Sequence, residues 1–326
     1  MTVDYLRFFP GWARQAGGPP PVPEWWPWRG MRVRLERITD PAAPVKLVVL
    51  HGAGGHARML LPYARMLGPL EVVAPDMPGY GLTRCEGRPV DYALWVDLAA
   101  ELIERERTRD GRPVVVLGAS IGGMLAYSAV ARAGADGLAV TCLLDVRRPE
   151  ARAAAARFAP LGRAAIPLMN ALRPAGGLRV PVRWLARMSA MSNQPELNAA
   201  VVRDRLGGGG RVQLRFLRTY LSSAPEVEPE DFTACPVLMV HPAADRWTPA
   251  ALSTPFFDRL RVGKRLVMLD GCGHMPVEEP GLTQMAGALR RFTAETAERP
   301  SRPGDPARSS PPPRRASSPP PSPDRP

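Results

Sequence analysis

The stretch "VVVLGASIGGMLAY", residues 114–127, places a single serine between an apolar run and a helix-forming run. The apolar first half predicts a buried strand, and the residues from Met124 onward predict a helix. Between them, Gly118, Ser120 and Gly122 form the pattern G-x-S-x-G, whose small residues permit a tight, strained turn that exposes the serine hydroxyl. Such a Gly-rich turn also occurs without a catalytic serine. Ser120 is therefore a candidate nucleophile whose partners must be found elsewhere.

Short apolar strands alternate with helical segments on both sides of this turn. An alternating apolar and basic segment, residues 31–38, predicts a half-exposed strand ahead of them. Strands are predicted at 46–52, 71–76, 113–120, 138–145, 236–245 and 264–274, and helices at 58–67, 92–107, 121–133, 249–260 and 280–296. This alternation predicts an α/β fold with a mostly parallel sheet that carries helices on both faces.

The rhythm of strands and helices is interrupted once, which divides the chain into regions. An Arg- and Ala-rich, helix-prone block that contains "GGGG" separates the fourth strand from the fifth, and we expect it to form a helical cap above the strand ends. The predicted regions are a Pro/Trp-rich arm (1–30), a core in two pieces (31–146 and 231–296), a cap insertion (147–230) and a disordered Pro/Ser/Arg-rich tail (297–326).

Composition limits the classes of function. The net charge of +12 raises the possibility of nucleic-acid binding, but the tail holds six arginines against three acids and the remaining charge is distributed over the rest of the chain. We therefore expect no nucleic-acid partner. Four widely spaced cysteines favour reduced thiols in the cytoplasm over disulfides or a metal site, and no cofactor is expected. We expect neither a signal peptide nor an integral membrane span of about 20 apolar residues.

A serine hydroxyl needs a base that removes its proton, and the chain has only four histidines. His274 lies in "DGCGHMPVEEP", directly after the last apolar strand. In a parallel sheet that position falls at the same carboxyl edge as Ser120. His274 is therefore the predicted catalytic base.

The imidazole in turn needs a carboxylate that fixes its tautomer. Asp245 ends "PVLMVHPAAD" at the same edge, and the order Ser120, Asp245, His274 is the one expected after a G-x-S-x-G turn. Asp145, at the end of "LAVTCLLD", is the alternative acid, whereas Asp270 suits a turn better.

The negative oxygen of a tetrahedral intermediate needs two backbone donors. The N–H of Ile121, the residue after the serine, is the first candidate. The second comes from the loop "HGAGGHARM", where Ala53 is preferred and Gly54 is the alternative.

Five motifs in this order resemble the α/β-hydrolase superfamily. They are "VVLHGAGG", "DMPGYGLT", "GASIGG", "HPAADRWTP" and "GCGHMPVEEP", and they cover about residues 31–296. The resemblance implies an eight-stranded, mostly parallel sheet, a cap after the sixth strand, and acyl transfer through an acyl-enzyme. Among subfamilies, the monoglyceride-lipase and lysophospholipase-like group is the most similar. Ser120 argues against the subfamilies that use aspartate as the nucleophile.

The favoured function is therefore a serine hydrolase that cleaves a carboxylic ester of a small-molecule acyl substrate, with a lipid monoester among the candidates. The same residues also fit a thioesterase, amidase, carbon–carbon hydrolase, perhydrolase or acyltransferase. A non-catalytic binding protein is the third hypothesis, and an intact serine–acid–histidine set argues against it. The sequence leaves the oligomeric state open.

Overall fold

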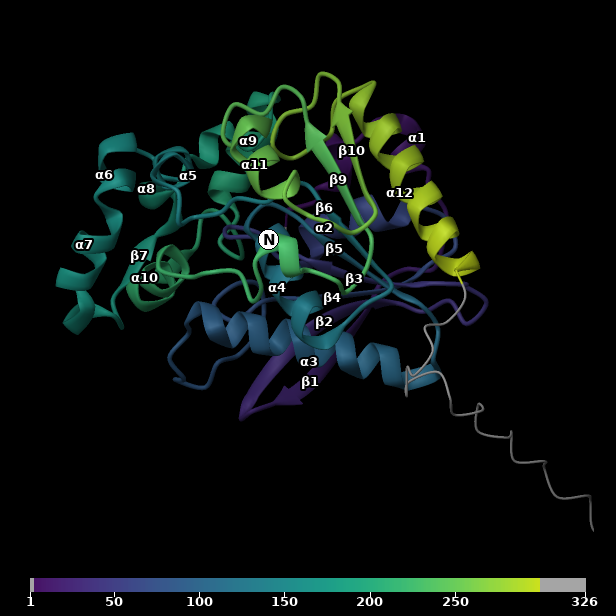
Figure 1. The fold of residues 1–326 in the computed structure, drawn as a ribbon, viewed down its shortest axis with the longest axis horizontal. Coiled ribbons are helices and arrows are strands. Elements are labelled where there is room, and N and C mark those ends of the chain that lie inside the picture. The colour runs from purple at the N-terminus through teal and green to yellow at the C-terminus, as the bar shows by residue number, and fades with distance from the viewer. Residues whose placement is uncertain (1–2, 300–326) are drawn as a thin grey trace, which may run out of the picture.

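The computed structural model describes residues 3–299 and contains a sheet of eight strands (Figure 1). The order across the sheet is β1-β2-β4-β3-β5-β6-β9-β10. The strands are β1 (Val22–Trp28), β2 (Met31–Ile38), β3 (Lys46–Leu50), β4 (Glu71–Pro75), β5 (Val114–Gly118), β6 (Gly137–Val140), β9 (Val237–Pro242) and β10 (Lys264–Leu269). Strand β2 runs antiparallel to both β1 and β4, and every other pair in the sheet is parallel, so the predicted mostly parallel α/β sheet is confirmed.

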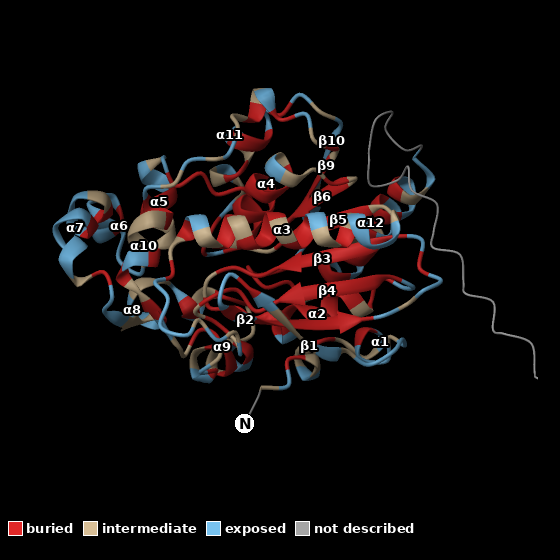
Figure 2. Ribbon diagram, turned by 90° about the horizontal axis from the view of Figure 1, so that it is seen from below, coloured by how far each residue is buried: buried red, intermediate tan, exposed pale blue. Residues whose placement is uncertain are grey.

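Helices cover the sheet on both faces, as the strand–helix alternation requires. The long helices are α2 (Ala57–Arg65), α3 (Tyr92–Asp110), α4 (Ile121–Ala133) and α12 (Gly281–Glu298). Helix α3 packs against α4 along one face (Figure 2). Its ends follow from the sequence, since Asp91 accepts a hydrogen bond from the Leu94 N–H and Gly111 takes the left-handed conformation that ends a helix.

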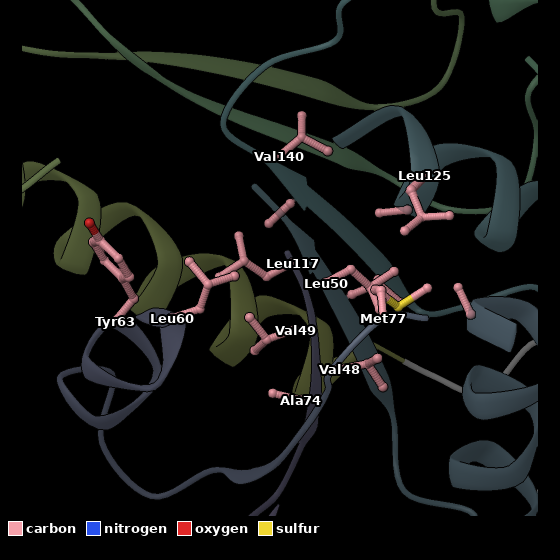
Figure 3. Packing of buried hydrophobic residues seen from close by; sticks show 14 of the residues in the cluster. Val48, Val49, Leu50, Leu60, Tyr63, Ala74, Met77, Leu117, Leu125 and Val140 are labelled. Carbon is pink, nitrogen blue, oxygen red and sulfur yellow. The ribbon is translucent and has the colours of Figure 1, made fainter. Parts of the chain in front are cut away.

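The core follows from the period of two along each strand. Val49 and its neighbour Leu117 face Leu60 and Tyr63 of α2, whereas Val48 and Leu50 point to the other face, toward α4 (Figure 3). All five residues of β3 and all five of β5 are buried. This explains why both strands read as continuous apolar runs.

The core begins before residue 31, so its predicted N-terminal boundary is wrong. Residues of the predicted arm form β1, which pairs with β2 along its whole length, and a short helix α1 (Gly11–Arg14) that packs against α2. Pro23 and Pro27 hide this strand in the sequence, because proline is excluded from central strands. An edge strand tolerates it, since one side of the strand needs no ladder hydrogen bonds.

The segment between β6 and β9 leaves the sheet and extends to the end of the molecule away from α12 (Figure 1). It contains α5 (Pro149–Ala155), α6 (Ala159–Arg163), α7 (Ala165–Ala171), β7 (Arg179–Pro181), α8 (Val182–Leu185), α9 (Pro195–Arg203), β8 (Arg211–Gln213) and α10 (Leu214–Leu221). The short strands β7 and β8 pair with each other. The chain then returns to the sheet as β9, followed by α11 (Thr254–Phe257) and β10.

The predicted tail lies outside the described residues apart from its first three, of which Ala297 and Glu298 end α12. Among residues 3–299, none of the helices combines the length and the apolar character that crossing a bilayer requires.

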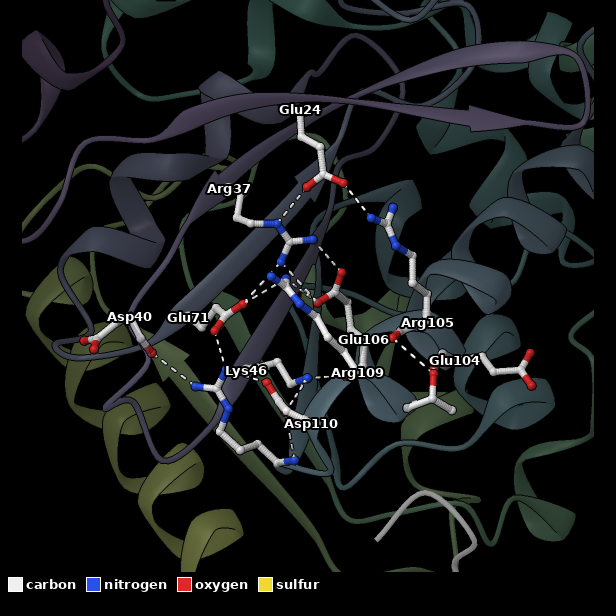
Figure 4. Close-up of polar contacts among 12 residues, drawn as sticks. Glu24, Arg37, Asp40, Lys46, Glu71, Glu104, Arg105, Glu106, Arg109 and Asp110 are labelled. Carbon is white, nitrogen blue, oxygen red and sulfur yellow. Dashed lines mark hydrogen bonds and ion pairs between the residues drawn. The ribbon is translucent and has the colours of Figure 1, made fainter. Parts of the chain in front are cut away.

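Strand β2 is not half-exposed as its alternating pattern predicts. Arg37 is buried and makes ion pairs with Glu24, Glu71 and Glu106, which come from β1, β4 and α3 (Figure 4). These groups belong to a set that we call the amino-edge cluster, because it lies where β3 and β4 begin. Its members are Glu24, Arg37, Lys46, Glu71, Glu106, Arg109, Asp110 and Arg112. Carboxylates, of which Glu71 and Glu106 are buried, pair with the basic side chains here.

Candidate active site

Ser120 occupies the sharp turn between β5 and α4. The backbone φ of Ser120 is +57°, a value that residues other than glycine rarely adopt, so the backbone of the turn is strained. A Cβ at Gly118 would lie 2.2 Å from the carbonyl oxygen of Gly122, and a Cβ at Gly122 would lie 2.3 Å from that of Leu50. Both glycines of G-x-S-x-G are therefore required by close backbone approach. The hydroxyl group of Thr141 supports the turn by accepting a hydrogen bond from the Ser120 N–H at 2.9 Å.

His274 lies in the loop after β10, at the carboxyl edge of the sheet. Its Nε2 is 2.9 Å from the Ser120 Oγ, so the two groups predicted from the sequence are in hydrogen-bond contact. The ring is buried, and the indole of Trp247 lies against it with 4.6 Å between ring centroids. This packing restricts the imidazole to the orientation that faces the serine.

Asp245 lies on the other side of the imidazole. Its Oδ2 is 2.8 Å from the His274 Nδ1, and its Oδ1 accepts hydrogen bonds from the backbone N–H groups of Trp247 and Thr248 at 2.7 and 2.9 Å. Burial alone would raise the pKa of Asp245, but the hydrogen bond and charge of His274, together with these backbone donors, hold the pKa well below its ordinary value. Asp245 is therefore a carboxylate at neutral pH.

This carboxylate fixes the tautomer of the neutral imidazole. Nδ1–H donates to Asp245, which leaves the Nε2 lone pair free to accept the proton of the Ser120 hydroxyl. The Thr248 Oγ1 also donates to the Asp245 Oδ2 at 2.9 Å and lies 3.1 Å from the His274 Nδ1. The arrangement can move a proton from the serine to the histidine while a negative charge remains beside it.

The alternative acid, Asp145, has a different partner. Both of its oxygens accept hydrogen bonds from the guanidinium group of Arg147, at 2.8 to 3.1 Å. Burial acts against ionisation, but Arg147 lowers the pKa of Asp145. Asp270 bonds to Gln284 at the start of α12 and to the backbone of Gly281 there, in keeping with a turn-forming role.

The candidate oxyanion donors lie beside the serine. A Cβ on Gly52 would come within 3.0 Å of the Ile121 N, so the loop that carries Ala53 runs alongside the start of α4. Ala53, Ser120 and Ile121 line one common cavity. Among the backbone hydrogen bonds of residues 3–299 that lie outside the helices and strands, none has the N–H of Ile121 or Ala53 as its donor.

Buried hydrogen bonds hold the loop after β3 in place. The His51 Nδ1 donates to the Gly52 carbonyl at 2.7 Å, and its Nε2 accepts from the Met77 N–H at 2.9 Å. Burial lowers the pKa of His51 to about 3, so the ring is neutral and structural. The carboxylate of Asp76 accepts a hydrogen bond from the N–H of Ala57 at the start of α2. This bond connects the "DMPGYGLT" motif to the helix that follows the loop after β3.

A cavity of about 170 Å³ opens from Ser120 into the segment between β6 and β9. Its lining is almost entirely apolar and aromatic, and many of its members come from α6, α7, α8 and the residue before α6. They include Phe158, Leu161, Leu168, Met169, Trp184 and Leu185. A smaller cavity, of about 50 Å³, is lined by Ser120, His274 and apolar residues of the core such as Val49 and Leu117. Ser120 therefore borders two cavities, a larger one that reaches α6, α7 and α8 and a smaller one beside the imidazole of His274.

Sequence reasoning missed the residues that support this site. Thr248 follows Asp245 by three residues, the spacing at which an aspartate accepts hydrogen bonds from the backbone ahead of it, and that spacing was the available signal. Asp204 was missed as well. It accepts hydrogen bonds from the Tyr5 hydroxyl and from His56, at 2.7 and 2.8 Å, and joins the loop after β3 to the segment between β6 and β9. No local pattern predicts a contact between residues so far apart in the chain.

The fold and the serine–histidine–aspartate geometry define a hydrolase-like α/β protein, and comparison with known families agrees. Residues 47–284 match the alpha/beta hydrolase family, and the chain belongs to this family. Lipase LipV of Mycobacterium tuberculosis is 33% identical over 105 residues, which cover 32% of this chain and 38% of that lipase. The match thus spans well under half of the curated relative.

Solved structures share the fold at low sequence identity. A monoacylglycerol lipase of Paleococcus ferrophilus is 20% identical, with a TM-score of 0.61 over 77% of this chain and 94% of that one. A soluble variant of the Saccharomyces cerevisiae monoglyceride lipase, in complex with a substrate analogue, is 13% identical, with a TM-score of 0.68 over 86% and 97% of the two chains. A carboxyl esterase of Bacillus coagulans is 17% identical, with a TM-score of 0.64 over 86% and 99%.

Proposed function

We propose that this chain is a serine hydrolase that cleaves a carboxylic ester with an apolar acyl group, and that a lipid monoester is its class of substrate. The observation that carries the proposal is the hydrogen-bonded path from Ser120 through His274 to Asp245, which begins on the wall of an apolar cavity. Family membership and the likeness to lipases and esterases support it.

In the first half of the reaction the Ser120 Oγ attacks the ester carbonyl carbon, and the His274 Nε2 accepts the hydroxyl proton. Asp245 stabilises the imidazolium that forms and remains ionised. The tetrahedral intermediate collapses when His274 returns the proton to the oxygen of the leaving alcohol. The alcohol departs, and an acyl ester of Ser120 remains.

In the second half a water molecule takes the position of the alcohol. His274 removes a proton from this water, whose oxygen attacks the acyl carbon, and then gives the proton back to the Ser120 Oγ as the carboxylic acid leaves. In both halves the negative oxygen of the intermediate accepts hydrogen bonds from the N–H groups of Ile121 and Ala53. Loss of one such donor typically lowers the rate by a factor of about 10² to 10³.

In this proposal residues 147–230 act as the cap, and the larger cavity between this cap and the sheet edge takes the acyl chain. The lining supports a long apolar chain, because it includes Ser120 as well as Leu168, Met169 and Trp184 of α7 and α8. The smaller cavity beside His274 suits a compact alcohol group. The wide cysteine spacing is our reason for assigning the enzyme to the cytoplasm.

The first experiment tests the nucleophile. Wild-type protein and Ser120→Ala are incubated with a fluorophosphonate probe, which reacts with activated serines. We expect labelling of the wild type only. Labelling that survives in Ser120→Ala would reject the assignment of Ser120.

The second experiment separates the two candidate acids. Asp245→Asn should lower kcat by a factor on the order of 10⁴, because the imidazole loses its tautomer control, whereas Asp145→Asn should leave kcat near the wild-type value. Hydrolysis of p-nitrophenyl butyrate measures both. The reverse pattern would exchange their roles.

A third experiment addresses the substrate. kcat/KM is measured on p-nitrophenyl esters of increasing chain length, and on thioesters and amides with the same acyl group. We expect kcat/KM to rise with chain length and esters to exceed amides. A preference for thioesters or amides would replace ester hydrolysis with one of those reactions.

A further inference from the structure

Exposed apolar side chains gather at one end of the molecule. Among residues 3–299, eleven large apolar side chains are exposed, and six of them lie between residues 157 and 187. The six are Phe158, Leu161, Leu168, Leu172, Leu178 and Trp184, with exposures from 37% to 61%. We call residues 157–187 the arginine-rich end. Much of the ribbon of its helices α6, α7 and α8 has the colour of exposed residues (Figure 2). A soluble surface rarely keeps so many large apolar groups together without a binding role.

The charged side chains of the arginine-rich end are all positive. Residues 151–195 contain no aspartate or glutamate, and the arginine-rich end contains six arginines: Arg157, Arg163, Arg173, Arg179, Arg183 and Arg187. All six are exposed, and none of them is ion-paired to a carboxylate of the described residues. Between residues 147 and 221 the chain holds 14 arginines against three acids, a net charge of +11 within a total of +12. The expectation of distributed charge is therefore wrong.

The arginine-rich end is continuous with the candidate active site. Four of its exposed apolar residues, Phe158, Leu161, Leu168 and Trp184, also line the cavity that leads to Ser120. The same side chains thus face solvent outside and the cavity inside. A partner that covers these four side chains therefore also covers part of the wall of the cavity that Ser120 lines.

We propose that the arginine-rich end docks on an anionic lipid surface. The apolar side chains insert at the boundary between headgroups and acyl chains, while the arginines extend along the surface to the headgroup phosphates. Trp184 suits this boundary because its ring is apolar and its N–H is polar. An acyl substrate then passes from the lipid into the cavity without crossing water.

The charge pattern selects this occupant over two others. A second copy of the chain would bring one carboxylate-free, arginine-bearing surface against another, and like charges repel. Nucleic acid would satisfy the arginines, but it would leave Leu172, Leu178 and Trp184 against a charged backbone. Only a surface that has both negative headgroups and a hydrocarbon layer matches both kinds of side chain.

The test measures binding to vesicles by the Ser120→Ala chain, which removes hydrolysis from the measurement. Vesicles of phosphatidylcholine alone are compared with vesicles that contain about one-third phosphatidylglycerol, by co-sedimentation at low and high salt. We expect binding to the anionic vesicles to be at least tenfold tighter, and to weaken as salt screens the charges. Each arginine close to an anionic surface contributes roughly a fivefold gain in affinity.

Matched variants assign the binding to the arginine-rich end. Arg163→Gln with Arg173→Gln and Arg183→Gln should weaken binding roughly a hundredfold. The control changes the same charge elsewhere, with Arg14→Gln, Arg261→Gln and Arg291→Gln on the exposed surface of the core, and should change binding by less than about threefold. Leu172→Ser with Leu178→Ser, outside the cavity lining, should weaken binding while the charge is unchanged.

Three outcomes would overturn the proposal. The first is equal binding of neutral and anionic vesicles, and the second is an equal loss in the two arginine triples. The third is binding to a different partner, which is either a second copy of the chain, seen as a dimer that Leu172→Ser with Leu178→Ser dissociates, or RNA bound in preference to vesicles. Docking does not depend on the proposed chemistry, because it is measured without Ser120. Hydrolysis of soluble p-nitrophenyl acetate by the arginine triple, expected at the wild-type rate, tests catalysis separately.

Discussion

Arginine has opposite surroundings at the two ends of this molecule. In the amino-edge cluster, Arg37 is buried and its guanidinium group donates to the carboxylates of Glu24, Glu71 and Glu106 (Figure 4). At the arginine-rich end, Arg163 and Arg173 are exposed and lack a carboxylate partner among the described residues. The same residue type is therefore a structural element in one region and an available charge in the other.

This difference shows which arginines can attract an anionic partner. A buried arginine must be paired, because removing its charge from water costs more than most folds can offset. Its field is then largely cancelled by its own carboxylates. An exposed arginine without a partner keeps its field, and several together attract anions. The following predictions test whether the two regions differ in this way, beginning with the largest change in the free energy of unfolding.

Glu106→Gln should destabilise the fold by about 3–5 kcal/mol. It removes one member of a buried pair and leaves the charge of Arg37 short of its closest partner, at 2.6 Å. Urea unfolding followed by circular dichroism measures the loss. The control is Glu226→Gln, an exposed partner of Arg132, which should cost less than about 1 kcal/mol. Equal losses for the two variants would contradict the structural role of the cluster.

Asp204→Asn should cost about 2 kcal/mol, less than the change in the cluster. The carboxylate is buried between Tyr5 and His56 and accepts a hydrogen bond from each, and an amide can accept from both only at the expense of its own unpaired N–H groups. Thermal unfolding measures the change, with the exposed Glu196→Gln as the control. Because His56 precedes α2, we also expect kcat to fall. An unchanged kcat would show that this link does not position the loop that carries Ala53.

Acid should weaken the amino-edge cluster before it affects the arginine-rich end. Burial opposes ionisation of Asp110, but hydrogen bonds from Arg112 and Lys46 lower the pKa of this carboxyl. A carboxyl whose pKa is lower in the folded state adds stability above its unfolded pKa, near 3.8, and that stability is lost as pH falls toward the folded value. Asp110 is one-third exposed, so solvent screening keeps its contribution to about 1 kcal/mol or less.

The measurement is the free energy of unfolding between pH 3 and pH 6, in wild type and Asp110→Asn. The wild type should lose stability more steeply as the pH falls, because the variant lacks this titrating group. Parallel curves would show that Asp110 has the same pKa in the folded and unfolded chains. Arginines 163, 173 and 183 do not titrate in this range, so their Gln variants should follow the wild-type slope.

The comparison also explains what the sequence could and could not predict. Ser120, Asp245 and His274 each follow a strand in a parallel sheet, so the order of strands and motifs was enough to predict one common edge. The partners of Arg37 could not be predicted, because three separate elements, β1, β4 and α3, supply them. Strand β1 was missed because its two prolines are permitted only at an edge, and which strand lies at an edge depends on the finished sheet.

The smallest expected effect concerns the arginine-rich end. Arg163→Gln, Arg173→Gln and Arg183→Gln should each change the free energy of unfolding by no more than about 0.5 kcal/mol, and the triple variant by no more than about 1.5 kcal/mol. These side chains are exposed, and removing like charges from a crowded positive surface slightly favours the compact state. Urea unfolding of the triple variant provides the measurement. A loss of several kcal/mol would mean that these arginines are held by the fold, as Arg37 is, and the contrast between the two ends would fail. A stability at or above that of the wild type means that the fold itself does not require the charges, which leaves binding as the reason for their presence.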